Sequence, residues 1–183
     1  MKYVILIPIY NDRESLKLLI ENINFEIKDL NHEISIVVIN DASSQQILDT
    51  YTNIQNINSI EIINMKINRG HTRCIAAGLK YIFEKKEFDF VIPMDGDGED
   101  RPEEIKNFVD LSEQSGEKSI IGERVKRSEG IIFRLCYLFH KFLTLAFTGQ
   151  SIKFGNFTCL SKSTVKKMLE EKATWNSFSG SLK

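Results

Sequence analysis

The acidic stretch DGDGED at positions 95–100 contains the residues best suited to chemistry. Asp95, Asp97 and Glu99 alternate with glycines, so their oxygens could surround one hard cation such as Mg²⁺ or Mn²⁺. A cation held by one or two carboxylates keeps open positions for phosphate oxygens. An EF-hand loop fits poorly, because its Gly-x₅-Glu continuation is absent and Pro102 begins a helix too early. A structural calcium loop and a solvated acidic turn remain alternatives.

Short apolar runs that alternate with helical patterns must position this acidic stretch. Continuous apolar runs indicate strands buried on both faces, which is typical of a parallel sheet covered by helices. Their alternation with helices predicts an α/β fold, an open and mostly parallel sheet with helices on both faces. The expected strands are 3–9, 34–40, 60–65, 88–94 and 118–124, and the expected helices are 15–23, 43–54, 72–85 and 102–114, the last with Pro102 at its first position.

Polar residues follow each of the five expected strands. Ligands of open α/β sheets bind beyond the carboxyl ends of the strands, so these residues are candidates for one shared site. Turns are polar in most proteins, which explains any single cluster but explains five together less well. The clusters are Tyr10-Asn11-Asp12, Asn40-Asp41, Asn68-Arg69-Gly70, Asp95 to Glu99, and Glu123-Arg124.

The composition excludes several classes of protein. With 183 residues, 24 Lys+Arg and 25 Asp+Glu, the chain has the size of one domain and no overall basic charge for nucleic acid. The apolar run at 3–9 is too short for a signal peptide or a membrane span. Cys74, Cys136 and Cys159 have no CxxC spacing and indicate reduced thiols, so we expect a cytoplasmic protein.

The pattern changes after residue 125. The segment 131–147 is apolar and aromatic but carries Arg134, His140 and Lys141. It fits a buried or domain-edge helix, or a helix that lies on a membrane surface or against a lipid acceptor. A bent strand at 152–161 and a helix at 163–171 are expected to follow. The last residues carry no closing element, so we expect that the chain is truncated.

Several of these stretches together resemble the inverting family-2 glycosyltransferases of the GT-A fold. The similar stretches are VILIPIYND, IVVINDAS, NRGHTRCIAAGL and the Asp-x-Asp that ends a strand. Within that family, the chain looks most like the polyprenyl-phosphate sugar transferases of the dolichol-phosphate mannose synthase type. The further similar stretches are VIPMDGDGEDRPEEI, IIGERVKR and FGNFTCLSKSTVKKM. The resemblance covers residue 3 to about residue 170, nearly the whole chain.

On the donor side, the resemblance implies a nucleotide-sugar site in residues 1–125 of a single GT-A domain. It implies that Asp41 binds the base, and that Asp95 and Asp97 hold the metal and the diphosphate. Glu99 falls where that group has a glutamine metal ligand. The turn that frames the base and ribose corresponds to Pro8, Tyr10, Asn11 and Asp12.

On the acceptor side, the resemblance implies that Arg124 binds an acceptor phosphate and acts with Asp97 in catalysis. Arg127 and Arg134 are further cations of this stretch. Asn156 and Thr158 stand where the group has an aspartate and an arginine, so a base and a cation are absent there. The acceptor is expected to be a polyprenyl phosphate or a surface glycan, reached at the inner face of the membrane, with peripheral contact through 131–147.

The predicted reaction is transfer of a sugar from a UDP- or GDP-sugar with Mg²⁺ or Mn²⁺. A sugar-1-phosphate nucleotidyltransferase is a weaker alternative, because the loop YNDRES after the first strand has no glycine to cradle a triphosphate. A catalytically weak nucleotide-sugar-binding or assembly module is a third alternative. His71 and His140 are interpreted as structural or surface residues. The oligomeric state stays open.

Overall fold

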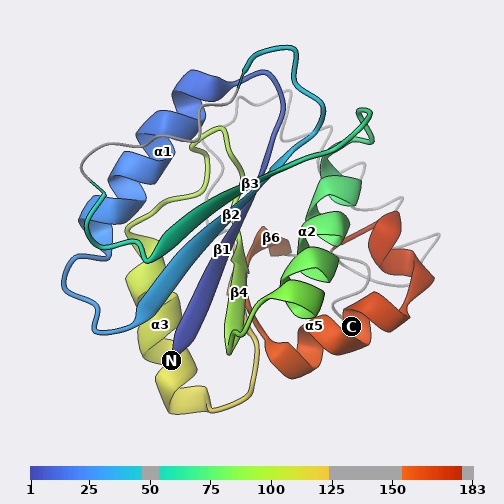
Figure 1. Ribbon diagram of the computed structural model, residues 1–183. Helices are drawn as coiled ribbons and strands as arrows, with labels where there is room; N and C mark the ends of the chain where they lie inside the picture. Colours follow the sequence, from blue (N-terminus) through green and yellow to red (C-terminus); the bar gives the residue numbers. More distant parts are fainter. Residues whose placement is uncertain (47–53, 124–153, 179–183) are drawn as a thin grey trace, which may run out of the picture.

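The computed structural model describes residues 1–46, 54–123 and 154–178. Its centre is a six-stranded sheet in the order β3-β2-β1-β4-β6-β5 (Figure 1). Neighbouring strands from β3 to β4 are parallel, whereas β6 runs antiparallel to both β4 and β5. The strands are β1 (Lys2–Ile9), β2 (Glu33–Asn40), β3 (Ser59–Asn64), β4 (Phe90–Pro93), β5 (Ile120–Glu123) and β6 (Phe154–Ser161).

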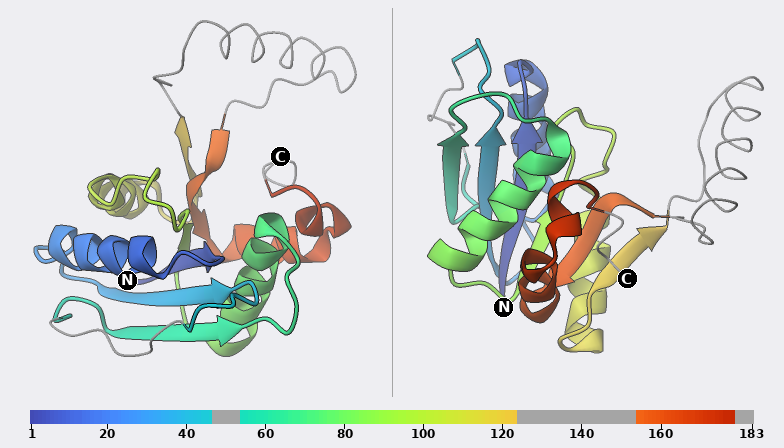
Figure 2. Two further views of the ribbon diagram at one scale, coloured as in Figure 1. Left: turned by 90° about the horizontal axis from the view of Figure 1, so that it is seen from above. Right: turned by 90° about the vertical axis from the view of Figure 1, so that its right-hand side faces the viewer.

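Helices cover both faces of the sheet, because alternate side chains of its strands point to opposite sides. Ile5 and Ile7 of β1 pack with α1 and α3 on one face, while Val4 and Leu6 pack with α2 and α5 on the other. The right-hand view of Figure 2 shows α2 and α5 in front of the sheet, with β5 beside β6. The helices are α1 (Arg13–Glu26), α2 (His71–Lys85), α3 (Glu104–Ser115) and α5 (Lys162–Glu170), followed by the 3-10 helix η1 (Lys172–Trp175).

The predicted fold class is confirmed: the sheet is mostly parallel and the strands alternate with helices. The apolar runs were predictive because both faces of the inner strands are buried. What the pattern did not indicate is the position of β6, which inserts antiparallel between β4 and β5. No helix within the three described ranges is long and apolar enough to cross a membrane.

Two expected helices differ from the observed structure. Pro102 does not start its helix, because α3 begins at Glu104 after a turn at 102–103. In the helix expected at 43–54, residues 43–46 and Ile54 are not helical, and the middle lies outside the described residues. Polar partners explain the first part, since the N–H of Ser43 donates to the Asn40 side chain at the end of β2 and the N–H of Ser44 donates to the Asn11 side chain after β1. The segment 131–147 lies wholly outside the described residues.

Two cysteines are predicted to be chemically inert in the folded protein. Burial raises the pKa of the Cys74 thiol and of the Cys159 thiol to about 12 each, and the nearby Asp41 carboxylate adds to the shift at Cys74. At pH 8 only about one such thiol in ten thousand is ionised, and the thiolate is the reactive form. In a Cys136→Ser background, we therefore expect a thiol reagent to label neither residue until denaturant is added. Stoichiometric labelling of the native protein would contradict this burial.

Candidate functional site at the carboxyl edge

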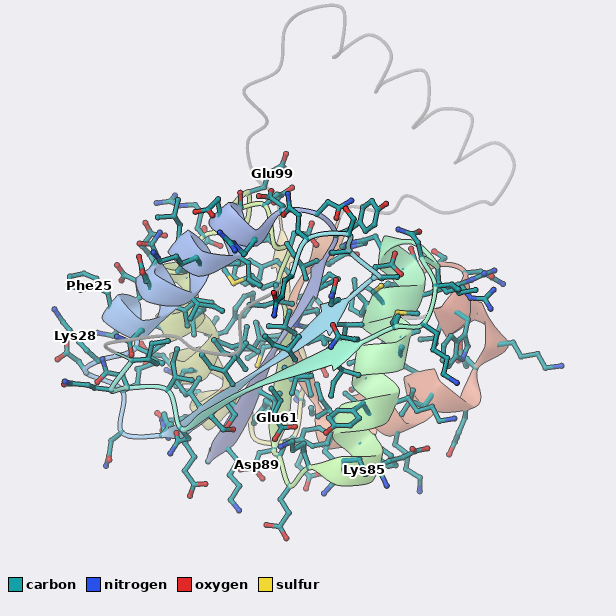
Figure 3. The ribbon with its side chains drawn as sticks, turned by 45° about the horizontal axis from the view of Figure 1, so that its top comes forward. Phe25, Lys28, Glu61, Lys85, Asp89 and Glu99 are labelled. Carbon is teal, nitrogen blue, oxygen red and sulfur yellow. The ribbon has the colours of Figure 1, made fainter. Side chains whose placement is uncertain are left out.

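Five strands of the sheet end at one edge, which we call the carboxyl edge and define by the ends of β1 to β5. The strands β1 to β4 are parallel, and β5 shares their direction because the antiparallel β6 separates it from β4. Since β6 runs the opposite way, it starts at this edge and brings Asn156 close to it. Figure 3 shows Glu99 at this end of the molecule and Asp89, which precedes β4, at the other end.

The loop after β4 is the acidic stretch, and it is packed tightly against the end of β1. A Cβ atom added to Gly96 would lie only 2.8 Å from the carbonyl oxygen of Pro8 and 2.9 Å from Ile9 Cδ1. No side chain fits there without moving the loop, so the close approach of the loop to β1 requires glycine at position 96. The backbone of Pro8 therefore contacts the acidic loop, and Pro8 itself is one of the buried residues of β1.

Internal hydrogen bonds hold the acidic loop in shape. The backbone N–H of Asp95 donates to Asp100 Oδ2 at 2.8 Å, and the N–H of Glu99 donates to Asp97 Oδ1 at 2.9 Å. Asp100 is only 4% exposed, so its carboxylate braces the loop from inside. Asp100 was not among the predicted site residues, although it belongs to the same run of acids. Asp97 and Glu99 are exposed at the surface of the loop.

Asp95 is the residue of this loop that most clearly fits a cation. Its side chain is 24% exposed, but its Oδ1 atom is buried and has no hydrogen-bond partner among the residues described. A buried carboxylate oxygen without a donor is costly, and a divalent cation would remove that cost. Within the described ranges, no three His, Cys, Asp or Glu side chains surround one point. Asp95, Asp97 and Glu99 thus do not form a ready cage.

Asn11 and Asp12 organise the turn that follows β1. Asn11 has a positive φ of 52°, and its Oδ1 accepts hydrogen bonds from the backbone N–H of Ser44 at 2.8 Å and from the Ser44 hydroxyl at 3.1 Å. Asp12 caps α1 by accepting from the N–H of Ser15 at 3.2 Å. These two predicted binding residues therefore tie the end of β1 to its neighbours. Tyr10, between them and the strand, is 53% exposed and presents its ring to solvent.

Asp41 binds the backbone of a neighbouring loop with both of its carboxylate oxygens. Oδ1 accepts from the N–H of Arg69 at 2.7 Å, and Oδ2 accepts from the N–H of Gly70 at 2.8 Å. The residue is 3% exposed. Hydrogen bonds from backbone N–H groups to a carboxylate are among the stronger neutral-to-charged contacts. Asp41, predicted to bind a base, thus fixes the segment that leads into α2.

His71 and Asn156 lie at the same edge, although sequence reasoning gave neither a binding role. His71 is the first residue of α2, and its Nε2 lies 3.3 Å from Asp95 Oδ1 and 2.9 Å from Asn156 Nδ2. His71 belongs to α2, Asp95 to the loop after β4, and Asn156 to β6. These side chains therefore meet only in the folded sheet. The sequence feature that could have predicted a site position for His71 is that NRGHTRCIAAGL follows a strand that ends at the carboxyl edge.

The cations predicted on the acceptor side cannot be located in the same way. Arg124 comes directly after Glu123, the last residue of β5, and lies outside the described residues together with Arg127 and Arg134. The two residues that depart from the resemblance are described. Asn156 contacts His71, and the buried Thr158 hydroxyl donates to the carbonyl oxygen of Asn156 at 3.1 Å.

The mostly parallel sheet with an acidic loop at its carboxyl edge belongs to the class of open α/β proteins, which bind ligands beyond the carboxyl ends of their strands. Comparison with known families narrows this class. The family model described as glycosyl transferase family 2 matches residues 4–163, and the chain belongs to this family.

Relatives and solved structures agree with this assignment. The undecaprenyl-phosphate 4-deoxy-4-formamido-L-arabinose transferase of Photorhabdus laumondii is 29% identical over 173 residues, which are 92% of this chain and 50% of that protein. The chain thus spans about half the length of the curated relatives it matches. TarS of S. aureus in complex with UDP-GlcNAc has a TM-score of 0.58 at 18% identity, covering 91% of this chain and 47% of its own.

A second solved structure shares the fold. The mannosyltransferase PcManGT of Pyrobaculum calidifontis, in complex with GDP-Man and Mn²⁺, has a TM-score of 0.56 at 15% identity. The match covers 91% of this chain and 46% of that one. At this level of identity, the two structures establish that the sheet and its helices have the GT-A arrangement.

Proposed function

We propose that this protein is a glycosyltransferase that moves a sugar from a nucleotide diphosphate donor to an acceptor, with a divalent cation at Asp95. The observation that carries the proposal is the buried Asp95 Oδ1, which has no hydrogen-bond donor among the described residues and lies at the carboxyl edge of a family-2 sheet. We propose Asp97 and Glu99, exposed on the same loop, as the further oxygen ligands. The nucleotide lies over the ends of β1 and β2.

Different residues of the carboxyl edge bind the donor or hold the loops that bind it. When bound, a divalent cation stabilises the negative charge that develops on the leaving diphosphate. The Asp100 side chain and the glycine at 96 hold the acidic loop in place, and Asp41 holds the loop at 69–70. Tyr10 offers an exposed ring on which the base can stack. The acceptor attacks opposite the leaving diphosphate, so the sugar's configuration inverts.

We propose a polyprenyl phosphate as the acceptor. The name of the Photorhabdus relative, an undecaprenyl-phosphate sugar transferase, supports this choice. So does the chemistry, because a phosphate acceptor is already ionised and needs no base, and Asn156 could not act as one. Arg124, directly after β5, would hold this phosphate through its planar donor fork. Contact with the membrane surface through 131–147 is part of the same proposal.

Calorimetry with UDP and with GDP tests the donor site. We expect one of the two nucleotides to bind the full chain with Mn²⁺ or Mg²⁺ present and to bind far more weakly in EDTA, because the diphosphate and Asp95 would otherwise repel each other. A thermal-shift screen with UDP-, GDP- and dTDP-sugars then identifies the donor, since a ligand that binds only the folded protein raises its Tm. Equal nucleotide affinity with and without metal would contradict the proposed site.

A further inference from the structure

The side chain of His71 faces the same point as the unpartnered oxygen of Asp95. Its Nε2 lies 3.3 Å from Asp95 Oδ1, which is ion-pair distance for a protonated imidazole, and no hydrogen bond to that oxygen is formed among the described residues. Two ligands on one cation, with bonds of about 2.1 Å, lie roughly 3.0–3.4 Å apart at angles of about 90–110°. The separation of these two atoms therefore suits two adjacent ligands of one metal ion.

The surroundings of His71 favour such a role. Its side chain is 46% exposed, so a cation and the oxygens of a diphosphate can approach. Asn156 Nδ2 lies 2.9 Å from the same Nε2 atom. Nε2 has one lone pair, which can accept from this amide or bind a metal, so the Asn156 amide must turn away when the cation is bound.

We propose that His71 is a direct ligand of the divalent cation, beside Asp95. This inference rests on the proposed cation site at Asp95 and adds a nitrogen to a set predicted to contain only carboxylate oxygens. Imidazole suits the later transition metals best, and both Mn²⁺ and Mg²⁺ favour oxygen ligands, but a nitrogen ligand is less unfavourable for the transition metal Mn²⁺ than for the hard, strongly hydrated Mg²⁺. The donor set formed by His71 and Asp95 therefore selects Mn²⁺ over Mg²⁺.

Pulsed electron paramagnetic resonance of bound Mn²⁺ tests this assignment directly, because it detects nitrogen bonded to the metal. The full chain is loaded with Mn²⁺, alone and with UDP, and compared with His71→Ala and His71→Gln. We expect imidazole nitrogen coupling in the unchanged protein and its loss in both variants. We also expect the Kd for Mn²⁺ to rise at least about tenfold and the preference for Mn²⁺ over Mg²⁺ to fall. Arg73→Gln, an exposed change in the first turn of α2, is the matched control and should keep the coupling.

The possible failures are distinguishable. Bound Mn²⁺ without nitrogen coupling in the unchanged protein, or coupling that persists in His71→Ala through His32 or His140, overturns the role of His71 and leaves the proposed function standing. Absence of Mn²⁺ binding, even with UDP, contradicts both the inference and the proposed cation site. Circular dichroism of both variants checks that α2 still forms.

Discussion

Replacement of Asp95 by asparagine is expected to weaken metal-dependent nucleotide binding by at least about 100-fold, since loss of a mere outer-shell partner of a metal already costs roughly 10–100-fold. The change keeps the shape of the side chain and removes the charge of a buried oxygen that no donor in the described residues satisfies. The loop should survive, because the bond that braces it uses the backbone N–H of Asp95 and the carboxylate of Asp100. Calorimetry with UDP or GDP and Mn²⁺ measures the effect.

The same variant should be at least as stable as the unchanged protein when no metal is present. The buried Oδ1 accepts no hydrogen bond among the described residues, and the imidazole of His71 at 3.3 Å offsets its charge only when protonated, so an amide at this position relieves the cost of burying the charge. Urea unfolding in EDTA measures the free energy of unfolding. Asp110→Asn, an exposed change on α3 far from the carboxyl edge, is the matched control for both measurements. If Asp95→Asn bound the nucleotide as tightly as Asp110→Asn, Asp95 would not be a metal ligand.

Replacement of Asp41 by alanine is expected to lower the free energy of unfolding by about 1–3 kcal/mol, because it removes the buried carboxylate to which two backbone N–H groups donate. Those donors belong to Arg69 and Gly70, at 2.7 Å and 2.8 Å from the carboxylate oxygens. Gly70 is the residue before α2, so the start of that helix and His71 should shift as well. Urea unfolding in the absence of ligands measures the change.

Nucleotide affinity separates two roles for Asp41. If the residue acts through the loop that it holds, stability and affinity fall together in Asp41→Ala. If it binds the base directly, affinity falls while the free energy of unfolding stays close to that of the Asp110→Asn control. The second outcome would contradict the positioning role that its two backbone hydrogen bonds indicate.

The sheet could be predicted from the sequence because its inner strands are buried on both faces. Runs such as the one at 3–9 are continuous, and the residues after them fall at strand ends, so parallel order alone brings them to one edge. The antiparallel β6 could not be predicted in this way, because its pairing with β4 and β5 depends on contacts far apart in the chain. The prediction that Pro102 starts a helix was wrong for a local reason, because Pro102 lies in the turn before α3 and proline also suits turns.

The partners of the site residues depend on tertiary structure, and the sequence indicated only their location. Asp41, Asn11 and Asp12 were each assigned to a ligand, yet each forms hydrogen bonds that organise neighbouring loops. Asn156 and His71 are 85 positions apart, so no local spacing signals their contact. Residue type and strand end therefore predict which side chains reach the edge, whereas donors and acceptors in the fold decide what each can do there.

Crystals of the full chain grown with Mn²⁺ and UDP or GDP test the central claim most directly. The account predicts an anomalous manganese peak about 2.1 Å from Asp95 Oδ1, with the diphosphate oxygens on the same ion and the base over the ends of β1 and β2. A nucleotide bound away from the carboxyl edge, or a manganese ion that does not contact Asp95, would contradict it.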